Sequence, residues 1–323
     1  MGGKMLNRLL FVLAVFNSAS LLAATPEEKP EEGPQYYFSV QASMVQRIHE
    51  LEFLDSTLTE SVIFRPNAPY VMRADISYDQ HSFKLESSDL VVGYDVDAEK
   101  VGTEYTDIEY ALNIFDEEYR VYYGEYQGFY VFGQTNSNGD FLNFPNIHTS
   151  RLGFIYRTYT STPQMLTFAT HPPGGFNSLP KTFGTSEYGL LIDISSISGI
   201  PSEPAVLAEI TNSNLLFFNK MRMITLAPFA GLLGRYATEK YYYEGGLSIG
   251  YGLQGRTYTL NNVRKTEVDM TMIGSGFFTA GRIISNSILL GLTVKIDTVS
   301  PSVDENEFSI STMDASMYFR MMF

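Results

Sequence analysis

The sequence predicts an all-β fold, a single antiparallel transmembrane β-barrel of about twelve strands, with ten to fourteen as the range. Apolar and polar residues alternate with period two in segment after segment from residue 36 onward, and no helical periodicity of useful length interrupts them. The 323-residue chain also has a mean hydropathy of −0.06. That near-neutral value excludes a polytopic helical protein, but it suits strands with one apolar and one polar face.

The clearest strand is the last, residues 313–323. Every odd position is apolar and the even positions are mostly polar. The segment resembles the closing strand of bacterial outer-membrane barrels, in which a terminal aromatic residue and the apolar residues two, four and six before it are read during insertion. The resemblance implies an assembly signal made of Phe323, Met321, Phe319 and Met317, with the barrel assembly machinery as a partner.

Composition narrows the function classes. A formal net charge of −14 argues against nucleic acid as a partner, because phosphate binding needs a basic face. There is no Cys, and the four His show no metal-ligand spacing, so we expect no disulfide, no metal and no cofactor. The 22 Tyr and 23 Phe suit membrane-interface girdles, although they also suit soluble sheets.

The N-terminus predicts export. Lys4 and Arg8 precede an apolar run over 9–16 that is too short to span a bilayer, and small residues follow up to Ala24. We therefore predict a signal peptide over 1–24, cleaved after Ala24. Residues 25–35 are acidic and Pro-rich and predict a flexible lead-in, and residues 36–323 are expected to form the barrel.

Alternating segments fill the rest of the chain. The better candidates are 38–44, 72–78, 108–114, 152–156, 188–194, 247–253, 268–272, 288–296 and 313–323, and the poorer ones are 57–64, 83–94, 119–131 and 164–169. In 119–131 Tyr occupies both faces, so the inward face is undetermined. We expect connections at 136–140, 171–175, 237–240, 281–283 and 300–307. Residues 198–223 form either a loop or a further strand, and an even strand number favours twelve.

Three segments carry a family resemblance. They are Phe64–Tyr70 with its Arg-Pro-Asn turn, the Tyr-rich Tyr122–Tyr130, and Leu247–Gly252. Together they resemble a domain-of-unknown-function family of predicted outer-membrane β-barrels from Gram-negative bacteria. The resemblance implies fold and location, and it brings no activity with it. In the Tyr-rich strand, we expect Gly124 and Gly128 to make room for the rings of neighbouring tyrosines.

The polar face of the strands is expected to line the barrel interior. It carries Arg73, Asp75, Glu109, Arg151, Arg157, Asp193, Arg235, Arg256, Glu267, Asp269, Lys295, Asp297, Asp314 and Arg320. Both signs occur in comparable number, so we expect ion pairs across the interior, because uncompensated charges there are costly. Twelve strands lie between filled eight-stranded barrels and open porins, so either a plug or a narrow charged pore fits.

His148 and Ser150 form the one enzymatic hint. They share a strand face, which parity with Leu152 and Phe154 predicts to be outward. Outer-membrane lipid A deacylases are similar in placing a His-x-Ser pair on the lipid-facing wall. A serine nucleophile also needs an acid that orients its base, and the sequence places none obviously. We therefore interpret the pair as a histidine at the membrane interface beside a loop serine, without a catalytic role.

We therefore expect a non-enzymatic integral outer-membrane barrel, either a narrow or plugged passive channel or a structural or surface protein. Its expected partners are outer-membrane lipid and lipopolysaccharide, and its ligand is unknown. One alternative is an outer-membrane enzyme that acts on lipid A or phospholipid through His148 and Ser150. A second is a secreted, soluble β-sandwich binding protein.

Overall fold

The structure is a computed structural model. It describes residues 38–55, 61–67, 70–87, 100, 102–135, 138–161, 163, 181–199, 220–260, 263–301 and 306–323. The predicted signal peptide, the lead-in over 25–35 and the weak strand candidate at 164–169 lie outside these residues. Within them, no helix is long and apolar enough to cross a membrane.

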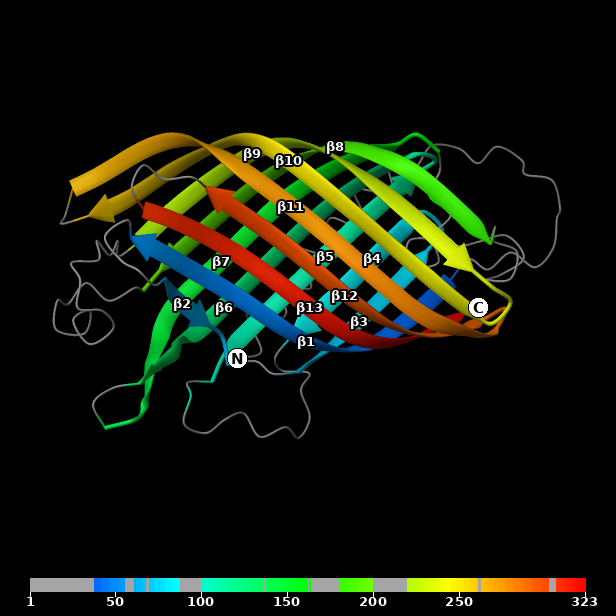
Figure 1. Cartoon of the computed structure of the whole chain (residues 1–323), viewed down its shortest axis with the longest axis horizontal. Coiled ribbons are helices and arrows are strands. Elements are labelled where there is room, and N and C mark those ends of the chain that lie inside the picture. The colour runs from blue at the N-terminus through cyan, green and yellow to red at the C-terminus, as the bar shows by residue number, and fades with distance from the viewer. Residues whose placement is uncertain are drawn as a thin grey trace. The chain divides into compact units, whose positions relative to one another are not determined.

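Thirteen antiparallel strands account for most of the described residues (Figure 1). They are β1 (Phe38–Asp55), β2 (Val62–Arg65), β3 (Val71–Tyr78), β4 (His81–Ser87), β5 (Glu104–Ile114), β6 (Glu117–Thr135), β7 (Phe141–Tyr159), β8 (Thr182–Ser198), β9 (Lys220–Ala237), β10 (Tyr241–Leu260), β11 (Val263–Ser285), β12 (Ile288–Pro301) and β13 (Asn306–Met322).

The strands close into a ring. β1 pairs with β13 from Ser39–Met322 to Asp55–Asn306, and Figure 1 shows the two strands side by side. Neighbours along the chain pair in turn from β3 to β13, and β3 pairs back to β1. The four-residue β2 lies outside this succession and bridges β1 to β6 where β3, β4 and β5 have already ended. The predicted all-β antiparallel barrel is confirmed.

The two ends of the barrel differ in their connections. We call the end where β1 begins and β13 finishes the turn end, and the opposite end the loop end. Two residues join β3 to β4 and β5 to β6, and each connection starts with a left-handed residue, Asp79 (φ 49°) or Phe115 (φ 53°). Outer-membrane barrels typically have such short turns at one end of the barrel.

Three details differ from the sequence prediction. The ambiguous region 198–223 contributes the start of a long strand, β9, which begins at Lys220. The connection expected at 281–283 lies inside β11, and β12 follows two residues after Ser285. In β6, Gly128 (φ 89°) forms a bulge, so interior residues are even-numbered before it and odd-numbered after it. Tyrosines occupy both faces even before this bulge, since Tyr122 lines the interior and Tyr123 bonds Glu125 on the outer face, and the bulge then reverses the parity for the rest of the strand.

The outer surface of the barrel is apolar. Ile249 on β10, Leu290 on β12 and Phe319 on β13 expose 64%, 43% and 42% of their surface, and they alternate with buried or half-buried interior residues. Apolar side chains this exposed on adjacent strands form a continuous belt, the surface that hydrocarbon covers in a membrane barrel. A water-soluble sandwich would bury these same positions between its sheets.

Aromatic residues border this belt at the turn end. Tyr78, Phe115, Tyr188, Tyr236, Tyr241, Tyr243 and Phe323 are all exposed there. Along β8 the outward face runs from Tyr188 through Ile192 and Ile194 to Ser196. These eight steps, at about 3.3 Å each and tilted by about 40°, give an apolar band roughly 20 Å tall. That height is close to the apolar band of outer-membrane barrels.

Candidate functional site: the barrel interior

The structure places the charged residues singled out from the sequence on the interior face. Arg73, Asp75, Glu109, Arg151, Arg157, Asp193, Arg235, Arg256, Glu267, Asp269, Lys295, Asp297, Asp314 and Arg320 all occupy inward positions of their strands. Sequence reasoning missed Arg47 and Glu86, which are equally interior. Arg47 continues the alternation of β1 beyond residue 44, so a longer strand prediction would have included it.

Arg47 on β1 is the centre of an ion-pair network. Its Nε and Nη2 atoms donate to the two oxygens of Asp314 on β13, both at 2.6 Å. Its Nη1 donates to Asp107 on β5 and to the hydroxyl of Tyr126 on β6, both at 2.9 Å. A single guanidinium thus joins β1 to β5, β6 and β13, and its fork geometry satisfies the Asp314 carboxylate in bidentate fashion.

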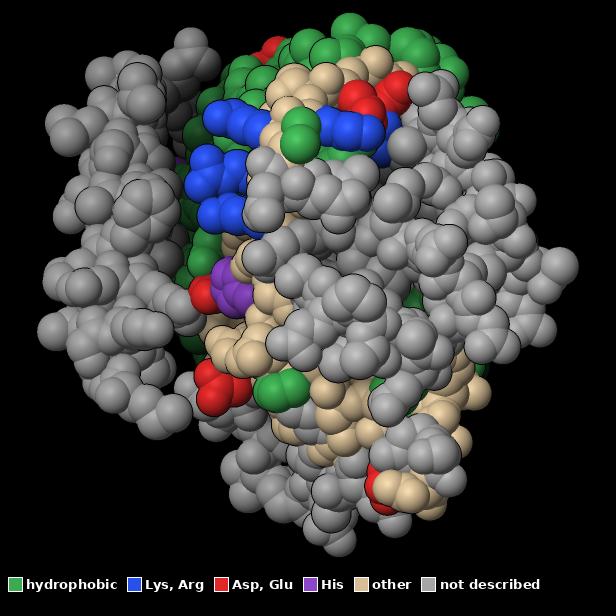
Figure 2. Space-filling view, turned by 90° about the vertical axis from the view of Figure 1, so that its left-hand side faces the viewer, with side chains coloured by type: hydrophobic (Ala, Val, Ile, Leu, Met, Phe, Trp, Pro, Cys, Tyr) green, Lys and Arg blue, Asp and Glu red, His purple; other side chains and the backbone are tan. Residues whose placement is uncertain are grey.

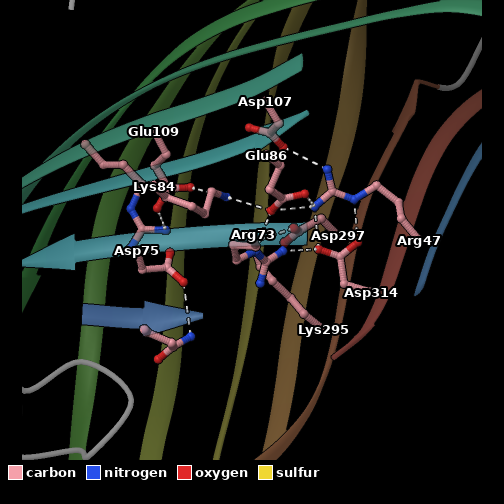
Figure 3. Close-up of polar contacts among 12 residues, drawn as sticks. Arg47, Arg73, Asp75, Lys84, Glu86, Asp107, Glu109, Lys295, Asp297 and Asp314 are labelled. Carbon is pink, nitrogen blue, oxygen red and sulfur yellow. Dashed lines mark hydrogen bonds and ion pairs between the residues drawn. The ribbon is translucent and has the colours of Figure 1, made fainter. Parts of the chain in front are cut away.

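Glu86 on β4 shares this network. Its carboxylate lies 3.0 Å from Nη2 of Arg47 and also accepts a hydrogen bond from Nε of Arg73 on β3. Arg73 in turn donates to Asp314 at 2.9 Å. Figure 3 shows these four side chains converging from different strands on one region of the interior. Two cations and two anions therefore alternate, and no charge among them is left without an opposite neighbour.

Further pairs extend the network around the wall. Lys84 contacts Glu109 at 3.0 Å, and Arg120 contacts Glu109 at 3.1 Å and Glu118 at 3.0 Å. Arg157 contacts Glu118 at 3.3 Å. Pairs between adjacent strands continue with Arg151–Asp193 and Arg256–Asp269. The interior charges are thus paired mainly between neighbouring or next-nearest strands.

A cavity of about 350 Å³ lies against this network. Arg47, Arg73, Lys84 and their partners line one side. Strands β10–β12 provide the other side with small side chains, including Gly246, Ser248, Ser275 and Thr293. The least buried charges on it are Lys295 and Asp297 of β12, whose side chains are 39% and 32% exposed. The more solvated charges on the cavity wall are therefore on β12, next to the buried network, where Lys295 is the cross-strand partner of Asp314.

An apolar cap fills the loop end of the interior. It consists of Leu51, Phe53, Val62, Phe64, Val71, Tyr105, Tyr126, Phe129, Val131, Leu142, Phe144, Ile147, Ile197, Met221 and Met223, all at most 9% exposed. The bulge at Gly128 and the bridging strand β2 turn Phe129 and Phe64 inward. Beneath the cap His49 stacks on Tyr126, with ring centroids 4.4 Å apart. The cap therefore fills the loop end of the interior along β1–β3 and β5–β9 with apolar side chains.

A second apolar layer, the tyrosine floor, lies at the turn end on β9–β13. It comprises Ala237, Tyr242, Ile283, Leu289, Tyr318 and Met322. The hydroxyls of Tyr242 and Tyr318 hydrogen-bond each other across β11 and β12. Gly281 and Gly291 lie beneath the rings, and a Cβ atom on either would come within 2.5 Å of the Tyr242 hydroxyl. Glycine at these two positions is what lets the rings lie across the barrel.

The glycines of the Tyr-rich strand have other roles than the one expected. The nearest atom to a Cβ on Gly124 would be 3.9 Å away, on Tyr126. The ring of Tyr122 instead covers Gly153 on the adjacent strand β7. Gly128 meets the carbonyl of Gly102 and forms the bulge described above. The glycine that makes room for a tyrosine ring is therefore on the neighbouring strand.

His148 and Ser150 face outward on β7, together with the exposed Leu152. Nε2 of His148 lies 2.8 Å from Oε1 of Glu125 on β6, and Oε2 of Glu125 accepts a hydrogen bond from the Tyr123 hydroxyl at 2.7 Å. Sequence reasoning missed this acid, which the pairing of β6 with β7 brings beside the histidine.

Ser150 has a different partner. Its Oγ atom lies 2.8 Å from Oγ of Ser196 on β8, and no hydrogen bond among the described residues joins it to His148. A base with its orienting acid is thus present, with a serine two positions away on the same face. No group of three or more His, Asp or Glu in the described part of the chain is arranged to hold a metal ion.

Comparison with known proteins finds remote structural similarity and no match in sequence. No protein-family model and no curated protein matches the chain. Among solved structures, outer-membrane protease OmpT from Escherichia coli is similar at 8% identity and a TM-score of 0.41, over 92% of this chain and 99% of that one. The translocator domain of autotransporter NalP from Neisseria meningitidis is similar at 12% identity and a TM-score of 0.39, over 99% and 96%.

Proposed function

We propose that this protein is an outer-membrane β-barrel whose interior is plugged by its own side chains, so that it serves a structural or surface role and is not an open diffusion pore. The observation that carries the proposal is the stack of three interior layers, namely the tyrosine floor, the ion-pair network and the apolar cap. A cavity of about 350 Å³ lies beside the ion-pair network, with Tyr318 of the floor in its wall.

Physical reasoning favours a plug over a narrow pore. Ions cross a barrel where water and solvated charge form a continuous path. Here Leu51, Phe64 and Phe129 in the cap have no exposed surface, and the cap packs dry apolar side chains from β1–β3 and β5–β9 into the loop end, where a water-filled path would have to run. Most charges below the cap are engaged with one another, Arg235 being an exception, and they are not arrayed as rings of one sign, the arrangement that selects ions in channels.

Planar-bilayer recording tests this proposal. The folded protein is expected to give no current above background, and steady single-channel steps would refute the plug. Leu51→Ala/Phe64→Ala/Phe129→Ala empties the centre of the cap and is expected to introduce a leak. The matched control Leu247→Ala/Ile249→Ala/Leu253→Ala removes similar apolar volume from the lipid-facing side and is expected to stay silent.

Location needs its own measurement. A folded barrel should migrate faster on a gel before heating than after it, and it should stay with the membrane fraction after a carbonate wash. Release of the protein by carbonate would favour a secreted soluble protein instead. The predicted signal peptide is tested separately, by sequencing the N-terminus of the mature protein, which we expect to begin at Thr25.

A second candidate function, hydrolysis of a lipid ester, is favoured by the Glu125–His148 contact. In this hypothesis Ser150 attacks the ester carbonyl and His148 takes its proton, while Glu125 orients the imidazole and stabilises its positive form. The alcohol leaves with that proton, and water then hydrolyses the acyl-serine. Ser150 would have to turn from Ser196 towards His148 for the first step. The site lies at the outer edge of the apolar belt, where lipid ester bonds occur.

This second candidate is tested by comparing lipid extracts before and after incubation with the folded protein. Release of fatty acid from lipid A or phospholipid should disappear in Ser150→Ala and fall strongly in Glu125→Gln. Ser196→Ala, which removes only the hydroxyl next to Ser150, should retain activity. Identical extracts with wild type and Ser150→Ala would reject the hypothesis without affecting the proposed plug.

A further inference from the structure

The apolar belt ends abruptly on strands β8–β11. Cross-strand pairing places Ile194, Ile224, Gly255 and Val268 in one outward row. The three large members are 49%, 57% and 66% exposed. The next outward row towards the loop end contains Ser196, Arg222, Thr257 and Thr266. A single step along the strands thus replaces hydrocarbon side chains with a guanidinium and three hydroxyls.

The row beyond continues the change. It pairs Ser198 with Lys220 on β8 and β9, and Thr259 with Arg264 on β10 and β11. We call Lys220, Arg222 and Arg264, with the hydroxyls of Ser196, Thr257 and Thr266, the rim patch. The three cations are exposed, and they face outward because they alternate with inward residues on their strands. Figure 2 shows Lys and Arg side chains gathered on this end of the barrel, beside the apolar surface.

The cations of the rim patch have no carboxylate partner in the part of the chain that the structure describes. Within the described residues, no ion pair or hydrogen bond involves the side chain of Lys220, Arg222 or Arg264, whereas the interior cations Arg47, Arg73 and Arg120 each contact at least two carboxylates. The chain as a whole carries a formal charge of −14. Three unpaired cations on one face of an acidic protein indicate an anionic partner supplied from outside.

The position of the patch indicates what that partner is. Lipid phosphates lie just beyond the hydrocarbon, which is where the outward rows change from isoleucine to arginine. Lys220 and Arg264 are on strands separated by β10 and are therefore about 10 Å apart laterally. That span exceeds a single phosphate, and the threonines between the cations can hydrogen-bond sugar hydroxyls.

We propose that the rim patch binds the phosphorylated sugar headgroup of an outer-leaflet glycolipid, with Lys220, Arg222 and Arg264 contacting phosphomonoesters and the belt below contacting the acyl chains. The proposal rests on the proposed outer-membrane location and is independent of whether the interior conducts. It assigns the β8–β11 side of the barrel as the preferred glycolipid-binding side.

Native mass spectrometry of the folded protein in neutral detergent tests the proposal, with lipid A, dephosphorylated lipid A and phosphatidylglycerol as probes. Wild type is expected to retain lipid A at least about tenfold more tightly than dephosphorylated lipid A, since each cation near an anionic lipid surface contributes substantially to binding. The preference should weaken as salt rises. Lys220→Gln/Arg222→Gln/Arg264→Gln should abolish the preference.

The matched control is Lys181→Gln/Lys240→Gln/Arg282→Gln, which removes three exposed cations from the turn end. It should retain the preference within about twofold. Equal loss in both variants, no loss in either, or equal binding of phosphatidylglycerol would overturn the assignment. This failure can be told apart from a failure of the proposed outer-membrane location. If the location is wrong, wild type shows no heat-modifiable barrel form. If wild type forms such a barrel but has no lipid preference, only the rim patch is refuted.

Discussion

Glu86 has no exposed surface, and its carboxylate lies between the guanidinium groups of Arg47 and Arg73. Its replacement by Gln keeps the shape and removes the charge, so both cations lose part of their compensation in a region away from bulk water. We expect Glu86→Gln to lower the free energy of unfolding by about 3 kcal/mol, because breaking a buried pair leaves an uncompensated charge. Urea titration of the refolded protein in micelles measures this.

The same change of charge at a solvated pair provides the control. Lys295 and Asp297 contact each other at 2.7 Å but are 39% and 32% exposed. Lys295→Gln should cost less than about 1 kcal/mol, the range of partly exposed pairs. Equal losses for Glu86→Gln and Lys295→Gln would mean that the interior network is hydrated throughout, and that burial does not determine its contribution.

Among the residues of the two sites, prediction succeeded where alternation alone decides direction. Parity placed His148 outward and Asp314 inward, and the structure has them there. Parity does not say which strands become neighbours, so the sequence did not reveal that Glu125 reaches His148. Nor did it reveal that Arg47 binds Asp314, 267 positions later in the chain. Such partners depend on strand register and ring closure.

At the scale of the element, glycines on β11 and β12 determine how the tyrosine floor packs. A side chain on Gly291 would collide with Tyr242 and Tyr318, whose rings occupy the space above it. We expect Gly291→Val to destabilise the barrel by about 2 kcal/mol, the usual cost of overpacking. The unfolding midpoint in urea is the measurement.

Gly255 on β10 is the matched position, since a Cβ there would have no atom within 4 Å. Gly255→Ala should change stability by no more than about 0.5 kcal/mol. If both substitutions were equally harmful, loss of backbone freedom in the strands would be the cause, and the packing of the tyrosine floor would not.

Element prediction was most successful for β10, β12 and β13, where the predicted alternating segments 247–253, 288–296 and 313–323 lie inside the strands but for Phe323. It was least successful where local geometry breaks the period. The bulge at Gly128 reverses which residues of β6 face inward. The sequence also predicted a connection at 281–283, which lies inside β11. The short strand β2 exists because it fills the space between β1 and β6, which no local pattern shows.

At the scale of the whole molecule, the position of the belt predicts how charge is tolerated on the outer surface. Ile249 lies midway along the outward face of β10, between Tyr243 at the girdle and Thr257 at the rim. Ile249→Lys should cost about 2–4 kcal/mol, and Thr257→Lys about 0–1 kcal/mol, as expected for the bilayer centre and its interface. Unfolding in lipid vesicles compares them, and the reverse order would contradict the placement of the belt.

The alternation of residues by itself determined that this chain forms strands with one apolar and one polar face, and that the apolar side chains point away from the charged ones. That followed from the two-residue period, which is a local property of the backbone. Tertiary structure alone decided whether the interior is filled. A ring of this size can hold water or side chains, and the outcome depends on which residues from distant strands meet inside it once the first and last strands join.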